Sequence, residues 1–414
     1  MGDSLRILFV GSLVGSRLRE ALRPGDEKYW IELFEWLSAQ GHKSRILSVT
    51  LDAPSRAPPE YEFIRPIRVP VPCGDERYNS EFHWMNATDN YASKTLTFPR
   101  IMRAIQRVSR EFRPDVVHFT ENYGPAMALL PLLGDSIPLT ISTPTYSHNA
   151  PFYDWFLQRS LQSFDAVAPF SDAYSEVIRK YGLPRSKIVT IRWGVDVDKT
   201  RPPTDKERSE ARDRLGISQN RVLLAWTGFI QQTNWGDFWF AYHLAELVRE
   251  AAPQRFAFGF CFKPVFYERA FLAWERPGVR IFGSSEEFSD VLRAADYLLS
   301  PIQSPNSTVA PPLTWLEALA MGVPLLVTPG PGVQEVVLPG ENGLVVRTPE
   351  EARDWLLGPG GDPELIRRLR IEARRVAEER FTLAQSGRRF VDLWKSLVDR
   401  RPAVGASVDP KSFG

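Results

Sequence analysis

One stretch in the second half of the chain decides its fold. Residues Leu313 to Val346 read LTWLEALAMGVPLLVTPGPGVQEVVLPGENGLVV. Pro311 and Pro312 come directly before it and suit the first turn of a helix, where the N–H group that proline lacks would have no partner within the helix. Two apolar runs follow, PLLVT and GLVV, each bounded by Gly or Pro. Short apolar runs of this kind indicate buried strands, so the stretch predicts helices that alternate with strands.

The same alternation recurs through the whole chain. Short apolar runs bounded by Gly, Pro or Asp are separated by longer helical stretches, an order that builds a parallel sheet, and we predict six such strands in each half. In the first half they are Arg6–Val10, Ser44–Thr50, Val116–Phe119, Leu139–Ser142, Ala166–Phe170 and Ile188–Ile191. In the second half they are Val222–Thr227, Phe256–Phe262, Val279–Phe282, Tyr297–Leu299, Pro324–Thr328 and Gly343–Val346. Ligands bind such sheets at the carboxyl ends of the strands, so we expect the site between the two halves.

Composition excludes several classes of protein. The 414 residues suit two domains, and 43% apolar with 24% charged residues is the balance of a globular protein. With 51 Lys and Arg against 50 Asp and Glu, no net field attracts nucleic acid. Cys73 and Cys261 are the two cysteines and form no short metal-binding motif or disulfide framework. No apolar run is long enough to span a membrane, so we expect a cytoplasmic protein.

Three motifs in the stretch Leu313 to Val346 carry a family resemblance: LEAxAxGxP from Leu316, G-x-x-E ending at Glu335, and G-x-N-G-x-x-V ending at Val346. Three segments of the first half carry the same resemblance: RILFVG, GDEKYWIELFEWLSAQGH and RPDVVHF. Together they resemble the retaining nucleotide-sugar glycosyltransferases of family 4 over most of the chain. The resemblance implies the GT-B fold, an α/β architecture of two Rossmann-like, doubly wound parallel-sheet domains that face a central cleft.

The expected domain organisation follows from that fold. Residues 1–192 are predicted as the acceptor-side domain and residues 205–380 as the nucleotide-sugar donor domain. Residues 193–204, WGVDVDKTRPPT, carry a glycine and a proline pair and are predicted as the hinge. Residues 381–400 are predicted as a helix that packs back toward the first domain, and 401–414 as a disordered tail.

The resemblance implies a set of donor-binding residues. The glutamate of LEAxA, here Glu317, is expected to hold the ribose hydroxyls, because a carboxylate accepts two hydroxyl hydrogen bonds. The amides of Leu313 and Thr314 are expected to face the diphosphate, since a helix N-terminus binds phosphate. The remaining candidates lie in loops at strand ends: Gly11, Ser12, Gly15, Gly228, Ser307 and Thr308. For Ser307 and Thr308 a plain loop role is an equal alternative, as is a simple turn for the two glycines of the first loop.

The chain departs from the family pattern at the sugar and at the diphosphate. Val309 stands where the first of two paired glutamates is expected, and Phe229 and Asn234 stand where an arginine and a lysine are expected. One cation at about 4 Å contributes roughly 4 kcal/mol of attraction in a protein-like dielectric. Lys263, after the strand Phe256–Phe262, is the first substitute that we predict, with Arg192 and Arg17 next.

The acceptor side offers polar residues but no histidine at the usual position. Thr120 takes that position and is able to bind a sugar hydroxyl, although it cannot act as a base at neutral pH. His148, in TPTYSHN at a strand end, is the better crevice candidate, and His118 is expected in the core. Trp193 and Trp235 either stack on a sugar or base or pack in the core.

One predicted helix has a basic face. Arg100, Arg103, Arg107 and Arg110 lie opposite the apolar residues of the segment Arg100 to Phe112. A solvated surface is one interpretation, and peripheral contact with an anionic lipid surface or an anionic acceptor is the other.

These features predict a hexosyltransferase-like enzyme that moves a sugar from a nucleotide diphosphate sugar to a glycan, lipid-linked or small-molecule hydroxyl. Retention is implied by the resemblance. No His/Asp cluster with ligand spacing is present, so we expect no metal and no cofactor besides the donor itself. Two alternatives stay open: a non-catalytic nucleotide-sugar-binding member, and an epimerase or phosphorylase on the same fold.

Overall fold

Two six-stranded sheets organise the molecule, and every strand pairing within them is parallel. The computed structural model describes residues 4–13, 25–50, 58–67, 91–134, 137–142, 158–228, 235–262, 269–283, 285–303 and 311–400. The first sheet has the order β3-β2-β1-β4-β5-β6 and the second the order β12-β11-β10-β7-β8-β9. Each is a doubly wound sheet whose strand order reverses beside its first strand, which is where such folds bind ligands.

Four of the six strands of the first sheet are buried along nearly their whole length, as parallel sheets covered by helices require. Its strands are β1 (Arg6–Gly11), β2 (Lys43–Val49), β3 (Tyr61–Ile64), β4 (Val116–Phe119), β5 (Leu139–Ile141) and β6 (Ala166–Val167). The helices around it are α1 (Gly25–Ala39), α3 (Tyr91–Phe112) and α5 (Asp172–Lys180), with 3-10 turns η4 (Gly124–Leu133) and η5 (Arg185–Lys187).

The sequence prediction for this sheet is wrong at its two edges. Ile188–Ile191 does not form a regular strand. It runs beside the end of the sheet with an isolated bridge from Ile188 to Val167 and two backbone hydrogen bonds, from Val189 N–H to Val167 O and from Ile191 N–H to Pro169 O. The sixth strand is instead Tyr61–Ile64, whose first three residues are only half buried. An edge strand pairs on one side and keeps polar residues, so YEFI lacks the continuous apolar run that marks the central strands.

In the second sheet all six predicted strands are present, with ends that shift by one residue or less. They are β7 (Val222–Gly228), β8 (Phe256–Phe262), β9 (Val279–Phe282), β10 (Tyr297–Ser300), β11 (Leu325–Val327) and β12 (Gly343–Val345). The surrounding helices are α6 (Asp205–Leu215), α7 (Trp235–Ala251), α8 (Ser285–Ala294), α9 (Leu313–Ala320), α10 (Val333–Val336), α11 (Pro349–Leu357) and α12 (Pro363–Arg380), with 3-10 turns η7 (Arg269–Trp274) and η8 (Pro359–Gly361).

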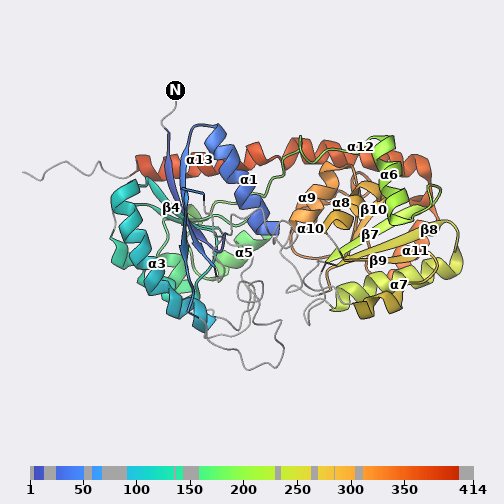
Figure 1. Cartoon of the computed structure of the whole chain (residues 1–414), viewed down its shortest axis with the longest axis horizontal. Coiled ribbons are helices and arrows are strands. Elements are labelled where there is room, and N and C mark those ends of the chain that lie inside the picture. The colour runs from blue at the N-terminus through green and yellow to red at the C-terminus, as the bar shows by residue number, and fades with distance from the viewer. Residues whose placement is uncertain are drawn as a thin grey trace, which may run out of the picture.

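The chain crosses between the halves twice. Residues 193–204 lead from the first half to α6, and α13 (Leu383–Asp399) follows α12 and returns to the first half (Figure 1). The two crossings touch at a bridge between Val195 and Thr382. Trp394 of α13 is fully buried, and its ring centroid lies 5.7 Å from that of Phe9 in β1. One cluster of buried apolar residues therefore continues from the first sheet through α13 into the second half.

Candidate donor site and its surroundings

Helix α9 begins at the carboxyl edge of the second sheet. Pro312 is its N-cap residue and provides no side-chain cap, so the N–H groups of Leu313 and Thr314 have no acceptor within the helix. Trp315, in the first turn, donates a hydrogen bond from its indole Nε1 to Ser300 Oγ at 2.8 Å. Ser300 is the last residue of β10. This bond holds the amino end of α9 beside the strand ends, where the helix dipole favours an anion.

Glu317 lies on α9 at the contact between the two halves of the molecule. Its side chain is 11% exposed and accepts a hydrogen bond on Oε1 from the ammonium group of Lys28 in α1. Burial lowers the pKa of Lys28, but the carboxylates of Glu317 and Glu32 outweigh it and the net pKa is raised, so Lys28 stays charged. A carboxylate has room for further donors on its two oxygens, so Glu317 is able to hold a hydroxyl while it binds Lys28.

Glu335, the glutamate of G-x-x-E, caps a helix of the other half. Its carboxylate accepts hydrogen bonds from the backbone N–H groups of Asp172 and Ala173, each at 2.9 Å, which are the first two residues of α5. Arg192 adds an ion pair to Glu335 at 3.3 Å and another to Asp172 at 2.5 Å. Arg192, predicted as a substitute cation for the diphosphate, is thus engaged by two carboxylates.

The ends of β1 and β4 bring three predicted residues together. Gly11 ends β1, and a Cβ atom there would collide with the hydroxyl of Thr120. Thr120 is 5% exposed, and its N–H donates to Val10 O at 2.9 Å. Ser12 donates from Oγ to Glu121 Oε2 at 2.5 Å. The structure therefore places Gly11, Ser12 and Thr120 at one strand edge, but the Ser12 hydroxyl is bound to a carboxylate of the same half.

A buried ion pair completes this edge. Lys94 of α3 lies 2.5 Å from Glu121 Oε1, and the side chains are 9% and 15% exposed. Sequence patterns did not single out Lys94, because it lies in the first turn of α3, at the far end of that helix from β4 and Glu121. The carboxylate of Glu121 is thus shared between Lys94 and Ser12, which fixes the geometry of the loop after β4.

Two aromatic candidates belong to the core. His118 is fully buried, its Nδ1 lies 2.7 Å from Thr140 Oγ1, and burial lowers its pKa to about 3. It is therefore the neutral core histidine that the strand pattern predicted. Trp193 is 2% exposed and packs edge-on against Phe170 with 4.5 Å between ring centroids, so it cannot stack on a ligand.

Two further predicted residues lie at the ends of elements in the second half. Gly228 ends β7, where a Cβ atom would press against the Trp226 ring. Trp235 begins α7, is 38% exposed, and stacks on Trp239. Several candidates lie outside the described residues, and their positions stay untested: Gly15, Arg17, His148, Phe229, Asn234, Lys263, Ser307, Thr308 and Val309, together with the tail 401–414.

Within the described ranges, no group of three or more His, Cys, Asp or Glu side chains is arranged to hold a metal ion. The same part of the chain contains no helix that is both long and apolar enough to cross a membrane. On the basic face of α3 all four arginines are exposed, but Arg107 is paired with Glu62, and Arg100 donates to the backbone oxygen of Arg65 at 3.0 Å.

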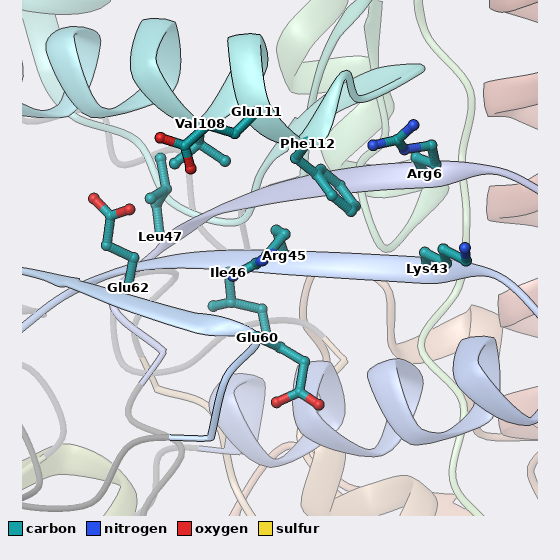
Figure 2. Close-up of a pocket in the computed structure, with 10 residues that line it drawn as sticks. All are labelled: Arg6, Lys43, Arg45, Ile46, Leu47, Glu60, Glu62, Val108, Glu111 and Phe112. Carbon is teal, nitrogen blue, oxygen red and sulfur yellow. The ribbon is translucent and has the colours of Figure 1, made fainter.

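A pocket of about 360 Å³ lies at the other end of the first sheet (Figure 2). It is lined by the starting residues of β1 and β2, Arg6 and Lys43, and is therefore at the edge opposite Gly11. Its charges are balanced, because its lining contains three basic residues, Arg6, Lys43 and Arg45, and three acidic ones, Glu60, Glu62 and Glu111. We assign no part of the transfer chemistry to it.

Comparison with known proteins agrees with this geometry. The family model described as Glycosyltransferase Family 4 matches residues 25–199, and that described as Glycosyl transferases group 1 matches residues 226–356. A D-inositol 3-phosphate glycosyltransferase of Xylanimonas cellulosilytica is 28% identical over 255 residues, which cover 57% of this chain and 58% of that protein. The chain thus spans little more than half the length of this curated relative, and 47% of a second from Nocardia farcinica.

Solved structures share the fold at low sequence identity. Sucrose-phosphate synthase of Thermosynechococcus elongatus superposes with a TM-score of 0.72 at 15% identity, covering 96% of this chain and 100% of that one. HepE of Anabaena in complex with UDP-glucose superposes with a TM-score of 0.66 at 13% identity, covering 95% and 100%. The two sheets are therefore those of a GT-B protein. With both halves matched by glycosyltransferase models, the chain belongs to glycosyltransferase family 4.

Proposed function

We propose that the protein transfers a sugar from a nucleotide diphosphate sugar to an acceptor hydroxyl, with retention at the anomeric carbon. The observation that carries the proposal is the placement of Glu317 on α9. A nearly buried carboxylate at the contact between the halves lies one turn beyond a helix N-terminus whose first amides have no acceptor within the helix. A nucleotide diphosphate presents ribose hydroxyls and phosphate oxygens, which are the groups that such a carboxylate and such amides bind.

In this proposal the bond between the anomeric carbon and the diphosphate oxygen breaks while the acceptor oxygen bonds to the same face of that carbon. The acceptor proton passes to the departing diphosphate. The amides of Leu313 and Thr314 stabilise the negative charge that develops there, with Lys263 as the proposed cation and Ser307 and Thr308 as further donors. We assign Gly11, Ser12, Gly15 and Gly228 to binding of the donor, and Thr120 and His148 to the acceptor side.

Further parts of the proposal concern the setting of the reaction. Residues 1–192 form the acceptor side and residues 205–380 the donor side, joined by a hinge at 193–204. No metal assists the departure of the diphosphate. The protein acts in the cytoplasm, and the exposed arginines of α3 give it peripheral contact with an anionic membrane surface. A phosphorylated polyol is the first acceptor to try, because a relative is named for D-inositol 3-phosphate.

A substrate screen tests the proposal. Thermal stability is measured with UDP, ADP, GDP and their sugars, and release of nucleoside diphosphate from the best donor is then followed with and without D-inositol 3-phosphate. We expect one base to stabilise the protein and acceptor to accelerate release. Stabilisation without turnover would support the non-catalytic alternative, which the loss of both diphosphate cations favours, and conversion of the donor without acceptor would indicate an epimerase. Failure of every nucleotide to bind would contradict the proposal.

A further inference from the structure

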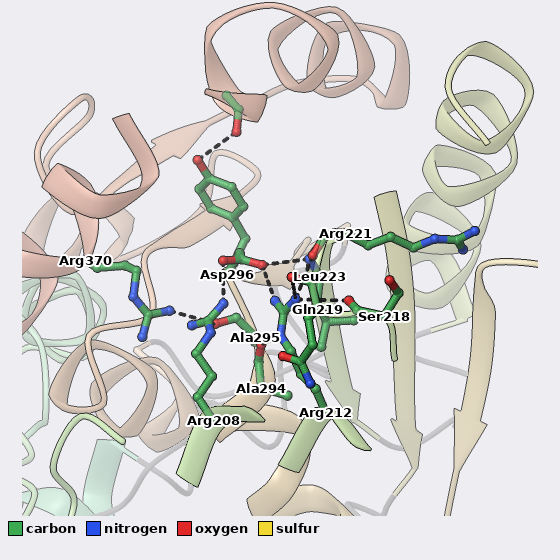
Figure 3. Close-up of polar contacts among 12 residues, drawn as sticks. Arg208, Arg212, Ser218, Gln219, Arg221, Leu223, Ala294, Ala295, Asp296 and Arg370 are labelled. Atoms are coloured by element: carbon green, nitrogen blue, oxygen red, sulfur yellow. Dashed lines mark hydrogen bonds and ion pairs between the residues drawn. The ribbon is translucent and has the colours of Figure 1, made fainter. Parts of the chain in front are cut away.

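A second pocket, rich in arginine, lies at the amino end of the second sheet. Its volume is about 400 Å³, and its lining includes Val222, which starts β7, and Asp296, which directly precedes β10 (Figure 3). This edge is opposite to the one where α9 begins, so the pocket is separate from the donor site. Among its described lining residues five are arginines and one is acidic: Arg208, Arg212, Arg221, Arg367, Arg370 and Asp296.

The single carboxylate is already bound on both oxygens. Asp296 accepts hydrogen bonds from Arg208 and Arg212, each at 2.6 Å, and from the backbone N–H of Leu223 at 2.8 Å. Arg212 is 3% exposed and also donates to four backbone oxygens, those of Ala294, Ser218, Gln219 and Arg221. The Arg212–Asp296 pair is therefore a structural tie between α6 and β10 and has no capacity left for a ligand.

Two of the other guanidinium groups have neutral hydrogen-bond partners. Arg370 of α12 donates to Ala295 O at 2.9 Å, and Arg221 donates to Gln254 Oε1 at 2.7 Å. Burial lowers the pKa of Arg370 to about 10, and the Arg208 guanidinium also lowers it. Asp296 and the more weakly coupled Asp205 act in the opposite direction. Arg208, Arg212 and Arg370 thus carry more positive charge than Asp296 neutralises in a half-buried pocket.

We propose that this pocket binds a phosphate group, as inorganic phosphate or as the phosphate end of a small metabolite. Guanidinium groups present planar pairs of N–H donors that match phosphate oxygens and form short, charge-assisted bonds. Arg370 and Arg208 bring guanidinium groups together from α12 and α6, while the guanidinium of Arg221, from the loop before β7, points away from them (Figure 3). A volume of about 400 Å³ falls within the usual range of small-molecule sites.

Phosphate in this position would neutralise the excess charge and link α6 to α12. Because the ligand binds the folded chain and not the unfolded one, it raises the melting temperature in a saturable way. The site is independent of the proposed transferase activity, since none of its lining residues belongs to the donor site.

The test uses the full chain with inorganic phosphate, glycerol 3-phosphate and sodium chloride at matched ionic strength, read by thermal unfolding and by calorimetric titration. We expect both phosphates, but not chloride, to stabilise the protein. Arg370→Gln should weaken phosphate binding by about tenfold or more, since it removes a charge-assisted partner. Arg368→Gln, exposed on the same helix and equal in charge change, should bind like the wild type, and so should Glu317→Gln, which reports on the donor site.

If Arg370→Gln does not fold, Arg208→Gln on α6, the other wall of the pocket, takes its place with the same expected loss. Tighter binding of glycerol 3-phosphate than of inorganic phosphate identifies an ester ligand, and equal binding identifies phosphate itself. The proposal is wrong if chloride stabilises the protein as well as phosphate does, or if Arg370→Gln and Arg368→Gln bind phosphate equally.

Discussion

At the residue scale, Gly11 and Thr120 show how closely the ends of the neighbouring strands β1 and β4 pack. A methyl group on residue 11 would collide with the Thr120 hydroxyl, so Gly11→Ala should lower the free energy of unfolding by about 1–3 kcal/mol, as overpacking does. In a Thr120→Ala background the colliding oxygen is absent, and the same change should cost much less. Urea unfolding of the four proteins measures this coupling, and equal costs in both backgrounds would show that the contact is not the cause.

His118 predicts how stability depends on pH. Its pKa is about 3 in the folded chain and 6.5 in the unfolded one, so the unfolded chain binds the extra proton between these values. The neutral histidine therefore contributes fully above pH 6.5, and the contribution is lost as the pH falls toward 3, at up to about 1.4 kcal/mol per pH unit. Unfolding free energies of the wild type and His118→Gln measured across this window should diverge in slope. Parallel profiles would mean that His118 is not buried in neutral form.

The site residues differ in how well sequence predicts them. Glu317 lies on a helix with a proline cap and a recognisable motif, so its place on that helix follows from local pattern. Its partner Lys28 is 289 positions away in α1, and nothing in either segment indicates the other. The pair of Glu121 and Lys94 was not predicted either. Side-chain contacts across a fold depend on packing and not on local periodicity.

At the scale of elements, the contact of α10 with α5 joins the halves. Glu335→Gln leaves an amide whose oxygen accepts one N–H of α5 while its NH₂ group faces the other, and Arg192 loses a partner. We expect a loss of about 1–3 kcal/mol in unfolding free energy, because a buried donor is left unpaired. Glu341→Gln, an exposed glutamate of the same segment, is the control, with a change within about 0.5 kcal/mol. A similar effect of both substitutions would argue against the cap.

The central strands were predictable because they are apolar runs buried on both faces, as in β8, whose residues are all buried. The edges were not. YEFI in β3 is half exposed, and Ile188–Ile191 runs beside β6 with too few backbone hydrogen bonds to form a regular strand. Apolar character reports burial, and it does not by itself determine where regular strand pairing begins or ends.

At the scale of the whole molecule, helix α13 follows the second half along the chain and packs into the core of the first half. Trp394 packs against Phe9, His118 and Phe390 and is fully buried. Trp394→Ala should therefore cost about 3–5 kcal/mol, and the loss should appear as destabilisation of the first sheet, far from it in sequence. Hydrogen exchange at β1 and β4 measures this effect, with Trp394→Phe as the milder control. Unchanged protection in those strands would show that α13 is not needed to hold the first half.

The central claim is that Glu317 and the amino end of α9 hold the nucleotide of the donor. The most direct measurement is calorimetric titration of the best-binding nucleoside diphosphate into the wild type, Glu317→Gln and Glu341→Gln. Loss of charge-assisted hydrogen bonds to the ribose should weaken binding to Glu317→Gln by about tenfold or more, while Glu341→Gln binds as the wild type does. Equal affinity of all three proteins would contradict the account and place the nucleotide elsewhere.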